Sequence, residues 1–371
     1  MVYRTINGIN INIDEKDANT VFFPTSFIKN FSGSINDQED IKKNIYAHNN
    51  NDRYFPLSVT WELTNKCCFN CGFCYIHRES NNESVDWVKG KIDRVVADLV
   101  SEGMLFCTIT GGECLIDPNF VYLYRLLKEK GIIVSVFSNG YYLGTKELEL
   151  FKELRPYKLE ISIYGVEQGV FEKTTSTRLD YKVVLNNILN LKRNGIRVKC
   201  KTPITSLTSK NIVKIRQWCN ENSIEYYISD ELFDSYYGDS VDVFRTYDEV
   251  YKEAVSSKES RIRKVCNYKF NQKVTWDCSA GKYTGVIGSD GAFYPCMSSV
   301  GIPQYRFQFQ SNILGAIENY RKTLIKEKNK ALEFCNGCKA CSVCELCTLS
   351  SLKYPRKLIE EKCKYYKELI I

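Results

Sequence analysis

Histidine is scarce in this sequence, and two other features are missing. Only His48 and His77 occur among 371 residues, so a zinc site of mixed cysteine and histidine ligands could use at most those two. No run is long and apolar enough to span a bilayer, and the N-terminus, MVYRTINGININIDEK, lacks the basic start and apolar stretch of a signal peptide. We therefore expect a cytoplasmic protein without a membrane partner.

A strong charge of one sign is also lacking. The 51 basic and 44 acidic residues leave a formal net charge of +7, which is spread along the chain. This modest excess favours solubility, and we expect no nucleic-acid partner. With 44% hydrophobic residues, the chain can form one large globular domain or two smaller ones.

Cysteine, in contrast, is abundant, with 17 residues. A chain of this size does not need disulfides, an odd count fits them poorly, and clustered CxxC spacings are typical of metal sites. Because histidine is scarce, thiolate-bound iron–sulfur clusters are the leading hypothesis, and a zinc ribbon is the alternative for the C-terminal cysteines. Four cysteines in strand or helix patterns are expected in the core: Cys107, Cys114, Cys200 and Cys219.

Short β-rich runs alternate with amphipathic stretches. The predicted strands begin at residues 57, 105, 132, 158, 197 and 224, and helices are predicted at 85–102, 117–130, 145–154, 179–194 and 208–221. This alternation predicts an α/β fold with a parallel sheet and right-handed crossovers, a partial (β/α)6 TIM barrel. Chemistry in such folds lies at the carboxyl ends of the strands.

Motifs with chemical potential follow four consecutive predicted strands. CCFNCGFC at 67–74 follows the first strand, GGE at 111–113 the second and SNG at 138–140 the third, while SIYG at 162–165 ends the fourth. Because the carboxyl ends of parallel strands meet at one edge, we expect these motifs on one rim.

The octapeptide can be read in two registers. Counting from Cys68 gives CxxCxxC, the start of a ferredoxin run, but Arg78 stands where the fourth cysteine is expected. Counting from Cys67 gives CxxxCxxC, with Cys71 and Cys74 as the other ligands. Three thiolates on a four-iron cluster leave one iron open to a small molecule, which indicates catalysis as well as electron storage.

CxxxCxxC after the first strand and GGE after the second resemble the radical S-adenosylmethionine (SAM) superfamily over residues 57 to about 235. The resemblance implies that Cys67, Cys71 and Cys74 bind the catalytic cluster and that Cys68 is a spare thiol. It also implies that SAM is bound by Tyr75 near the adenine, by Gly111, Gly112 and Glu113 at the methionine end, by Ser138, Asn139 and Ser162 at the ribose and carboxylate, and by Arg178 as the cation for the carboxylate.

Beyond residue 265 the periodicity weakens and cysteines dominate, in a pattern that resembles the SPASM domain of peptide and sulfatase maturases. The resemblance implies two auxiliary clusters, one on Cys335, Cys338, Cys344 and Cys363, the other on Cys278, Cys296 and Cys347 with Cys266 as the candidate fourth ligand. Cys347 departs from the family spacing and Cys341 is an extra cysteine. Within this part, VIGSDGAFYPC predicts a hairpin that turns at Asp290-Gly291.

Four parts are thus expected: an N-terminal extension at 1–55, the partial barrel at 56–235, a bridging region at 236–265 and the SPASM domain at 266–371. In the extension, Asn7-Gly8 predicts a hairpin. Peptide maturases commonly carry a leader-binding module at this position, and an exposed hairpin edge can accept a peptide strand. A strand pair that covers the open side of the barrel is the alternative.

The resemblances together imply a radical SAM maturase of a ribosomally made precursor peptide. A 5′-deoxyadenosyl radical would abstract hydrogen and lead to a thioether or another crosslink near cysteines. SAM and three 4Fe–4S clusters are the implied cofactors, and a flavodoxin or ferredoxin is the implied reductant. The alternatives are a sulfatase-type maturase that makes formylglycine, a peptide epimerase, and a non-enzymatic iron–sulfur electron carrier.

Overall fold

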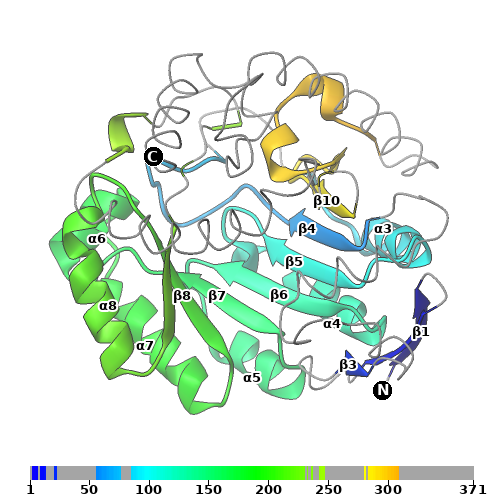
Figure 1. Ribbon diagram of the computed structural model, residues 1–371, viewed down its shortest axis with the longest axis horizontal. Helices are drawn as coiled ribbons and strands as arrows, with labels where there is room; N and C mark the ends of the chain where they lie inside the picture. Colours follow the sequence, from blue (N-terminus) through cyan, green and yellow to red (C-terminus); the bar gives the residue numbers. More distant parts are fainter. Residues whose placement is uncertain are drawn as a thin grey trace, which may run out of the picture.

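A curved sheet dominates the protein (Figure 1). The computed structural model describes residues 56–76, 85–229, 232, 235–236, 242–246, 280 and 283–308, and the backbone of 2–6, 9–13 and 21–22. Six neighbouring parallel strands match the predicted ones: β4 (Ser58–Glu62), β5 (Phe106–Thr110), β6 (Ile133–Ser138), β7 (Lys158–Ser162), β8 (Val198–Pro203) and β9 (Glu225–Ser229). The predicted α/β fold with a parallel, barrel-like sheet is confirmed.

Helices connect the successive parallel strands. They are α3 (Lys89–Ser101), α4 (Phe120–Glu129), α5 (Thr145–Glu153), α6 (Gln168–Thr175), α7 (Tyr181–Arg193) and α8 (Ile212–Glu221). Helices α5 to α8 lie along the outer side of the sheet (Figure 1). Five of the six correspond to predicted helices, and α6 is the addition. No helix in the described ranges is long and apolar enough to cross a membrane.

Short 3-10 helices occupy several connections. They are η1 (Cys114–Ile116), η2 (Ser209–Asn211), η3 (Asp242–Phe244), η4 (Met297–Ser299) and η5 (Pro303–Tyr305). η1 follows β5 after the three residues of the GGE turn and so belongs to the rim where the motifs gather. η2 replaces the first turn of the helix that the sequence predicts from residue 208.

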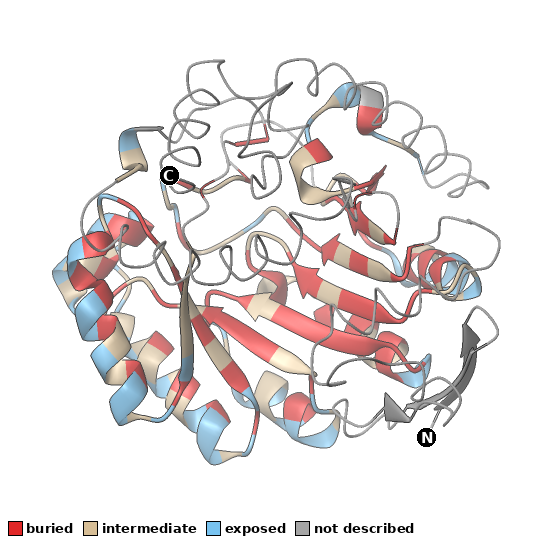
Figure 2. Cartoon of the chain, viewed as in Figure 1, coloured by how far each residue is buried: buried red, intermediate tan, exposed pale blue. Residues whose placement is uncertain are grey.

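The main core lies between the outer face of the sheet and the helices. Every second strand residue points to this side, as Val59 and Trp61 of β4 and Ile161 of β7 do, and each of these is at most 1% exposed. The outward surfaces of the helices are exposed (Figure 2). Burial of one such side chain contributes about 1.5–3 kcal/mol. The four cysteines predicted for the core are buried: Cys107, Cys114, Cys200 and Cys219.

The hairpin predicted at Asp290-Gly291 is confirmed, and it extends the same sheet. β10 (Thr284–Ile287) pairs antiparallel with β11 (Phe293–Tyr294). Gly291 has φ 72° in the turn, and the Gly288 N–H donates to the Ala292 carbonyl at 2.9 Å. β10 also pairs in parallel with β4, so the order is β11-β10-β4-β5-β6-β7-β8-β9. The hairpin therefore borders the strand that leads into the cysteine loop.

The N-terminal hairpin is confirmed as well. β1 (Val2–Ile6), β2 (Ile9–Ile13) and β3 (Val21–Phe22) form an antiparallel sheet. Ile6 lies opposite Ile9, which leaves Asn7-Gly8 as the two-residue connection that the sequence predicts. A role in leader-peptide binding stays a prediction.

Candidate active site

The ends of β4 and β5 are bonded together at one rim. After β4 the chain runs through Thr64 and Lys66 into the cysteine loop, residues 67–74. The Gly112 N–H donates to the Thr64 carbonyl at 2.7 Å, and the Glu113 N–H donates to the Lys66 carbonyl at 2.7 Å. The GGE turn is therefore attached to the main chain that leads into the cysteines.

Glycine is required at both positions of this contact. Gly111 has φ 138°, which strains a residue with a side chain, and a Cβ there would overlap the Thr64 carbonyl oxygen. A Cβ on Gly112 would overlap the carbonyl oxygens of Asn65 and Lys66. The sequence predicts that these glycines bind SAM. In the structure they allow the main chains of the two loops that follow β4 and β5 to pack directly against each other.

Glu113, which is 1% exposed, ties the GGE turn to the end of β6. Its carboxylate accepts hydrogen bonds from the Leu115 N–H at 3.1 Å, the Ser138 hydroxyl at 2.9 and 3.0 Å, and the Asn139 N–H at 2.7 Å. Burial raises the pKa of the Glu113 carboxyl to about 7, although the hydrogen bonds oppose this shift. The Glu113 carboxylate thus joins the turn after β5 to the end of β6, and its contact with the SAM ammonium group stays a prediction.

The three predicted cluster ligands, Cys67, Cys71 and Cys74, are half-buried in the loop after β4. The Phe69 N–H donates to the Cys67 sulfur at 3.4 Å. The Cys74 N–H donates to the Cys71 carbonyl at 3.1 Å, which forms a tight turn between these two cysteines. Local hydrogen bonds therefore shape the loop around its thiols.

Asn139 faces the two adjacent cysteines. Its side-chain amide donates to the sulfur of Cys67 at 3.4 Å and of Cys68 at 3.3 Å, while its side-chain oxygen accepts from the Tyr141 N–H at 2.9 Å. The pKa of the Cys68 thiol is raised, first by its hydrogen bond with Cys67 and then by burial. Because Asn139 contacts both sulfurs, the choice of Cys67 as ligand stays a prediction.

Aromatic rings surround the cysteine loop. Edge-to-face contacts with centroids 5.4–6.1 Å apart join Phe69 to Tyr164 and Phe171, and Phe73 to Tyr164 and Phe244. The pKa of Tyr164 is raised well above its usual value by burial and by the nearby thiols, Cys71 foremost. Tyr164 belongs to the SIYG segment that the sequence places at this rim, but the predicted SAM-binding residues do not include it.

Two further residues that the sequence prediction does not name, Glu62 and Tyr236, lie beside Tyr75 at the end of the cysteine loop. The Tyr75 ring packs against Tyr236, with centroids 5.3 Å apart, and the Tyr236 N–H donates to the Tyr75 carbonyl at 2.8 Å. The Tyr236 hydroxyl donates to Oε1 of Glu62 at 2.5 Å. Glu62 is 1% exposed, and burial raises its pKa to about 7. These two side chains come from positions 174 residues apart, so no local pattern indicates their contact.

The remaining predicted residues lie in separate places. Ser162 ends β7, is half-buried and shares a hydrogen bond with the Tyr164 side chain. Arg178 is exposed between α6 and α7. Cys296 follows β11 and is half-buried. The other predicted auxiliary ligands lie outside the described residues: Cys266, Cys278, Cys335, Cys338, Cys344, Cys347 and Cys363, as does Cys341.

The surroundings of the cysteine loop fit a thiolate-bound iron–sulfur cluster. Within the described ranges, no three cysteine, histidine, aspartate or glutamate side chains converge closely enough to bind a single metal ion. Half-buried thiols, N–H donors to sulfur and an aromatic wall are the surroundings that such a cluster needs.

Comparison with known proteins agrees with this chemistry. The family described as "Radical SAM superfamily" matches residues 61–220. The sporulation killing factor maturation protein SkfB of Bacillus subtilis is 24% identical over 259 residues, 66% of this chain and 61% of SkfB. The antilisterial bacteriocin subtilosin biosynthesis protein AlbA of Bacillus subtilis is 30% identical over 160 residues, 42% of this chain and 35% of AlbA. The chain thus matches less than two thirds of either relative.

A solved structure has a similar architecture. Streptococcus suis SuiB bound to S-adenosylmethionine superposes with a TM-score of 0.64 at 14% identity, and the match covers 95% of each chain. At this low identity the likeness shows a common architecture.

Proposed function

Residues 61–220 belong to the radical SAM superfamily, and on that premise we propose that the protein is an enzyme that modifies a ribosomally made precursor peptide. The observation that carries the proposal is the half-buried loop of Cys67, Cys71 and Cys74, attached to the GGE turn and surrounded by aromatic rings. SkfB is named as a maturation protein and AlbA as a bacteriocin biosynthesis protein, and SuiB has been solved with its precursor peptide SuiA. These relatives support a peptide substrate.

The protein's own residues bind and orient the cofactors and keep water out of the site. When bound, SAM and a four-iron cluster supply a 5′-deoxyadenosyl radical that abstracts hydrogen from a peptide carbon. Cys67, Cys71 and Cys74 would hold the cluster, and the Phe69 N–H and the Asn139 side-chain amide, which donate to the Cys67 sulfur, would stabilise the charge on its thiolate. Tyr164 and Phe73 keep water from the loop. The SAM-binding residues are Tyr75, Gly111, Gly112, Glu113, Ser138, Asn139, Ser162 and Arg178.

The C-terminal cysteines form the second part of the proposal. Cys296 and the auxiliary ligands named above would hold two further clusters, and such clusters would supply a site for an electron or for a substrate thiolate during crosslinking. A flavodoxin or ferredoxin is the reductant. Reconstituted protein should then hold about twelve iron atoms, four for each of three clusters. About four iron atoms with stoichiometric zinc would contradict the auxiliary clusters.

The test is an anaerobic incubation of the full chain with dithionite, SAM and a precursor peptide encoded beside its gene, followed by mass spectrometry. We expect 5′-deoxyadenosine and a peptide lighter by two hydrogens. Cys67→Ala should abolish 5′-deoxyadenosine formation, whereas the matched control Cys68→Ala should retain it. Equal loss in both variants would overturn the assignment of Cys67.

Other outcomes identify the alternatives. An unchanged peptide mass with deuterium taken up from solvent indicates an epimerase. Conversion of a cysteine or serine in a whole protein to formylglycine indicates a sulfatase-type maturase. Absence of SAM cleavage under reducing conditions contradicts the enzyme and favours an electron carrier.

A further inference from the structure

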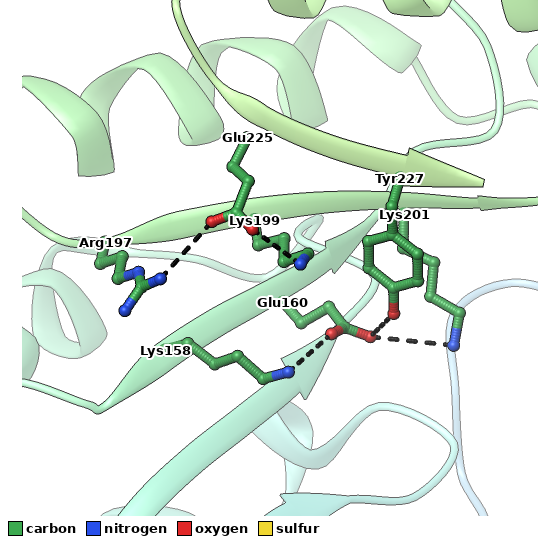
Figure 3. A network of polar contacts seen from close by, with 7 residues as sticks. All are labelled: Lys158, Glu160, Arg197, Lys199, Lys201, Glu225 and Tyr227. Atoms are coloured by element: carbon green, nitrogen blue, oxygen red, sulfur yellow. Dashed lines mark hydrogen bonds and ion pairs between the residues drawn. The ribbon is translucent and has the colours of Figure 1, made fainter. Parts of the chain in front are cut away.

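A network of charged side chains lies on the inner face of β7, β8 and β9 (Figure 3). It occupies the strand positions that alternate with core residues such as Ile161 and Cys200, so it faces away from the helices. Glu160 of β7 lies opposite Lys199 of β8, and Lys199 lies opposite Glu225 of β9. The network thus crosses three adjacent strands.

Cations outnumber carboxylates in this network. Lys158 and Lys201 lie 3.2 and 3.7 Å from the carboxylate of Glu160. Lys199 and Arg197 lie 2.7 and 3.7 Å from that of Glu225. The Tyr227 hydroxyl donates to Glu160 at 2.7 Å. Four cationic groups therefore share two carboxylates, which leaves a net positive charge on the described residues of this network.

The negative charge of Glu160 is buried, whereas the positive charges of its lysines are partly exposed. The Glu160 side chain is 4% exposed, whereas those of Lys158 and Lys201 are 28% and 32% exposed. The Glu160 carboxylate is fully engaged by Lys158, Lys201 and Tyr227. The two lysines keep part of their surface accessible to a ligand. In a closed barrel this interior is filled by branched apolar side chains. A charged inner face is costly to bury without partners and is suited to a polar ligand.

The network continues to the candidate active site. Lys201 lies opposite Ser162 in register, and Ser162 is hydrogen-bonded to Tyr164. The Tyr164 ring packs against Phe73 of the cysteine loop at 5.9 Å. An extended ligand at the rim can therefore reach the lysines along the same face of the sheet.

A neighbouring hydroxyl points to the same conclusion. Ser135 lies opposite Lys158 in register, on the next strand, β6. It is 1% exposed, and its hydroxyl has no hydrogen-bond partner among the residues that the structure describes. An unpaired buried hydroxyl costs about 1–3 kcal/mol, so this face offers polar capacity that the described residues do not use.

We propose that the inner face of β7–β9 binds acidic side chains of the substrate peptide, with Lys199 and Lys201 as specificity-determining residues. The inference rests on the proposed peptide substrate and adds its chemical class. Glu160 and Tyr227 position Lys201, and Glu225 restrains Lys199 and Arg197 until a peptide carboxylate competes for them.

The test measures binding of fluorescein-labelled hexaglutamate, hexaglutamine and hexalysine to the reconstituted full chain by anisotropy at low salt. Hexaglutamate should bind about tenfold more tightly than hexaglutamine, and hexalysine should bind least. K199Q and K201Q should each weaken hexaglutamate binding about threefold to tenfold. E225Q should strengthen it, because that change releases Lys199 and Arg197.

K152Q is the matched control, since Lys152 pairs with Glu149 at 2.9 Å on the outer surface of α5. Equal binding of the three peptides, or equal affinity in K199Q and K152Q, would overturn the inference. Loss of SAM affinity in K201Q with unchanged hexaglutamate binding would also overturn it, because Lys201 would then serve the SAM carboxylate. SAM cleavage by the parent protein without peptide tests the proposed function separately.

Discussion

The rim at the ends of β4–β6 and the inner face of β7–β9 are built in contrasting ways. At the rim, main-chain N–H groups and a buried carboxylate hold the loops, and Gly112 leaves no space for a methyl group. On the inner face, long side chains form ion pairs and keep about a third of their surface exposed, as Lys201 does. The rim is therefore rigid and intolerant of change, while the inner face can adapt to a ligand.

The largest expected effect is that of Gly112→Ala at the rim. The new Cβ would overlap two main-chain oxygens of the segment that leads into the cysteines, so the turn must move. We expect a loss of at least about 2 kcal/mol in the free energy of unfolding, together with loss of cluster iron. Denaturant unfolding and iron analysis measure the two effects.

Gly90→Ala in α3 is the control for that substitution. No atom lies within 4 Å of a Cβ at Gly90, and alanine favours a helix by up to about 1 kcal/mol. If both variants unfold alike, the rim is no more rigid than a helix surface and the contrast disappears.

Glu62→Gln tests the buried charge beside the rim through pH. The folded-state pKa of Glu62 is about 7, above its ordinary 4.5. The proton is therefore bound more tightly in the folded protein, and stability falls as pH rises from about 4.5 to above 7. The contribution of Glu62 to this loss approaches about 3 kcal/mol. Glu62→Gln should remove that contribution and leave the similar one of Glu113, whose pKa is also about 7.

Unfolding at pH 5.5 and 8.5 captures about 2 kcal/mol of the Glu62 contribution, since the rest is lost below pH 5.5. Three ionisable groups face Glu62: Tyr236 and Tyr75 from the segments around the cysteine loop, and Asp290 from the hairpin turn, which also raises its pKa. Glu129→Gln, at the exposed end of α4, is the control and should leave the pH dependence as in the parent. A parent protein equally stable at both pH values would contradict the prediction.

Glu160→Gln makes the same chemical change on the inner face. It should lower the free energy of unfolding at pH 8, whereas Glu62→Gln should raise it. Glu160 is paired with two lysines and Tyr227, so removal of its charge leaves those cations facing each other. The lysines are partly exposed and solvent screens them, so we expect a loss of only about 1 kcal/mol at pH 8. If Glu160→Gln instead stabilises the protein at pH 8, as Glu62→Gln should, the predicted difference between the two regions is wrong.

The smallest effect is expected from Arg125→Ala on the helical surface. Arg125 and Glu153 form a two-bond ion pair at 2.5 and 2.7 Å, but their side chains are 39% and 57% exposed. Exposed pairs contribute little, so the free energy of unfolding should change by at most about 0.5 kcal/mol. The change in the free energy of unfolding caused by Glu160→Gln should exceed this value.

Most of the sheet can be predicted because its pattern is local. The six parallel strands are short β-rich runs, and helices such as α7 begin beside a capping residue, Asp180, whose side chain accepts from the Lys182 N–H at 2.9 Å. α6 escapes prediction because QGVFEKTT is eight residues long and carries a glycine and two threonines. Long-range contacts also shorten α3: the Val85 N–H donates to the Ser289 carbonyl at 2.8 Å, and the helix begins at Lys89 rather than at residue 85.

The candidate site divides in the same way. The positions of the cysteine loop, the GGE turn and Asn139 follow from the rule that parallel strands end on one side. The partners of Glu113 and the contact between Glu62 and Tyr236 do not follow from any short pattern, because they depend on how distant segments pack. Sequence therefore locates the loops, and packing decides which atoms within them touch.

The pairing of β10 with β4 also sets an order of events during synthesis. β4 ends at Glu62, whereas its neighbour on one side begins at Thr284, about 220 residues later. At roughly 5–20 residues per second, translation needs about 10–45 s to supply that neighbour. Throughout this interval the strand that carries the cysteine loop is an open edge, able to pair with other chains. The nascent protein must therefore keep its predicted cluster-binding loop beside an unprotected strand until the hairpin emerges from the ribosome.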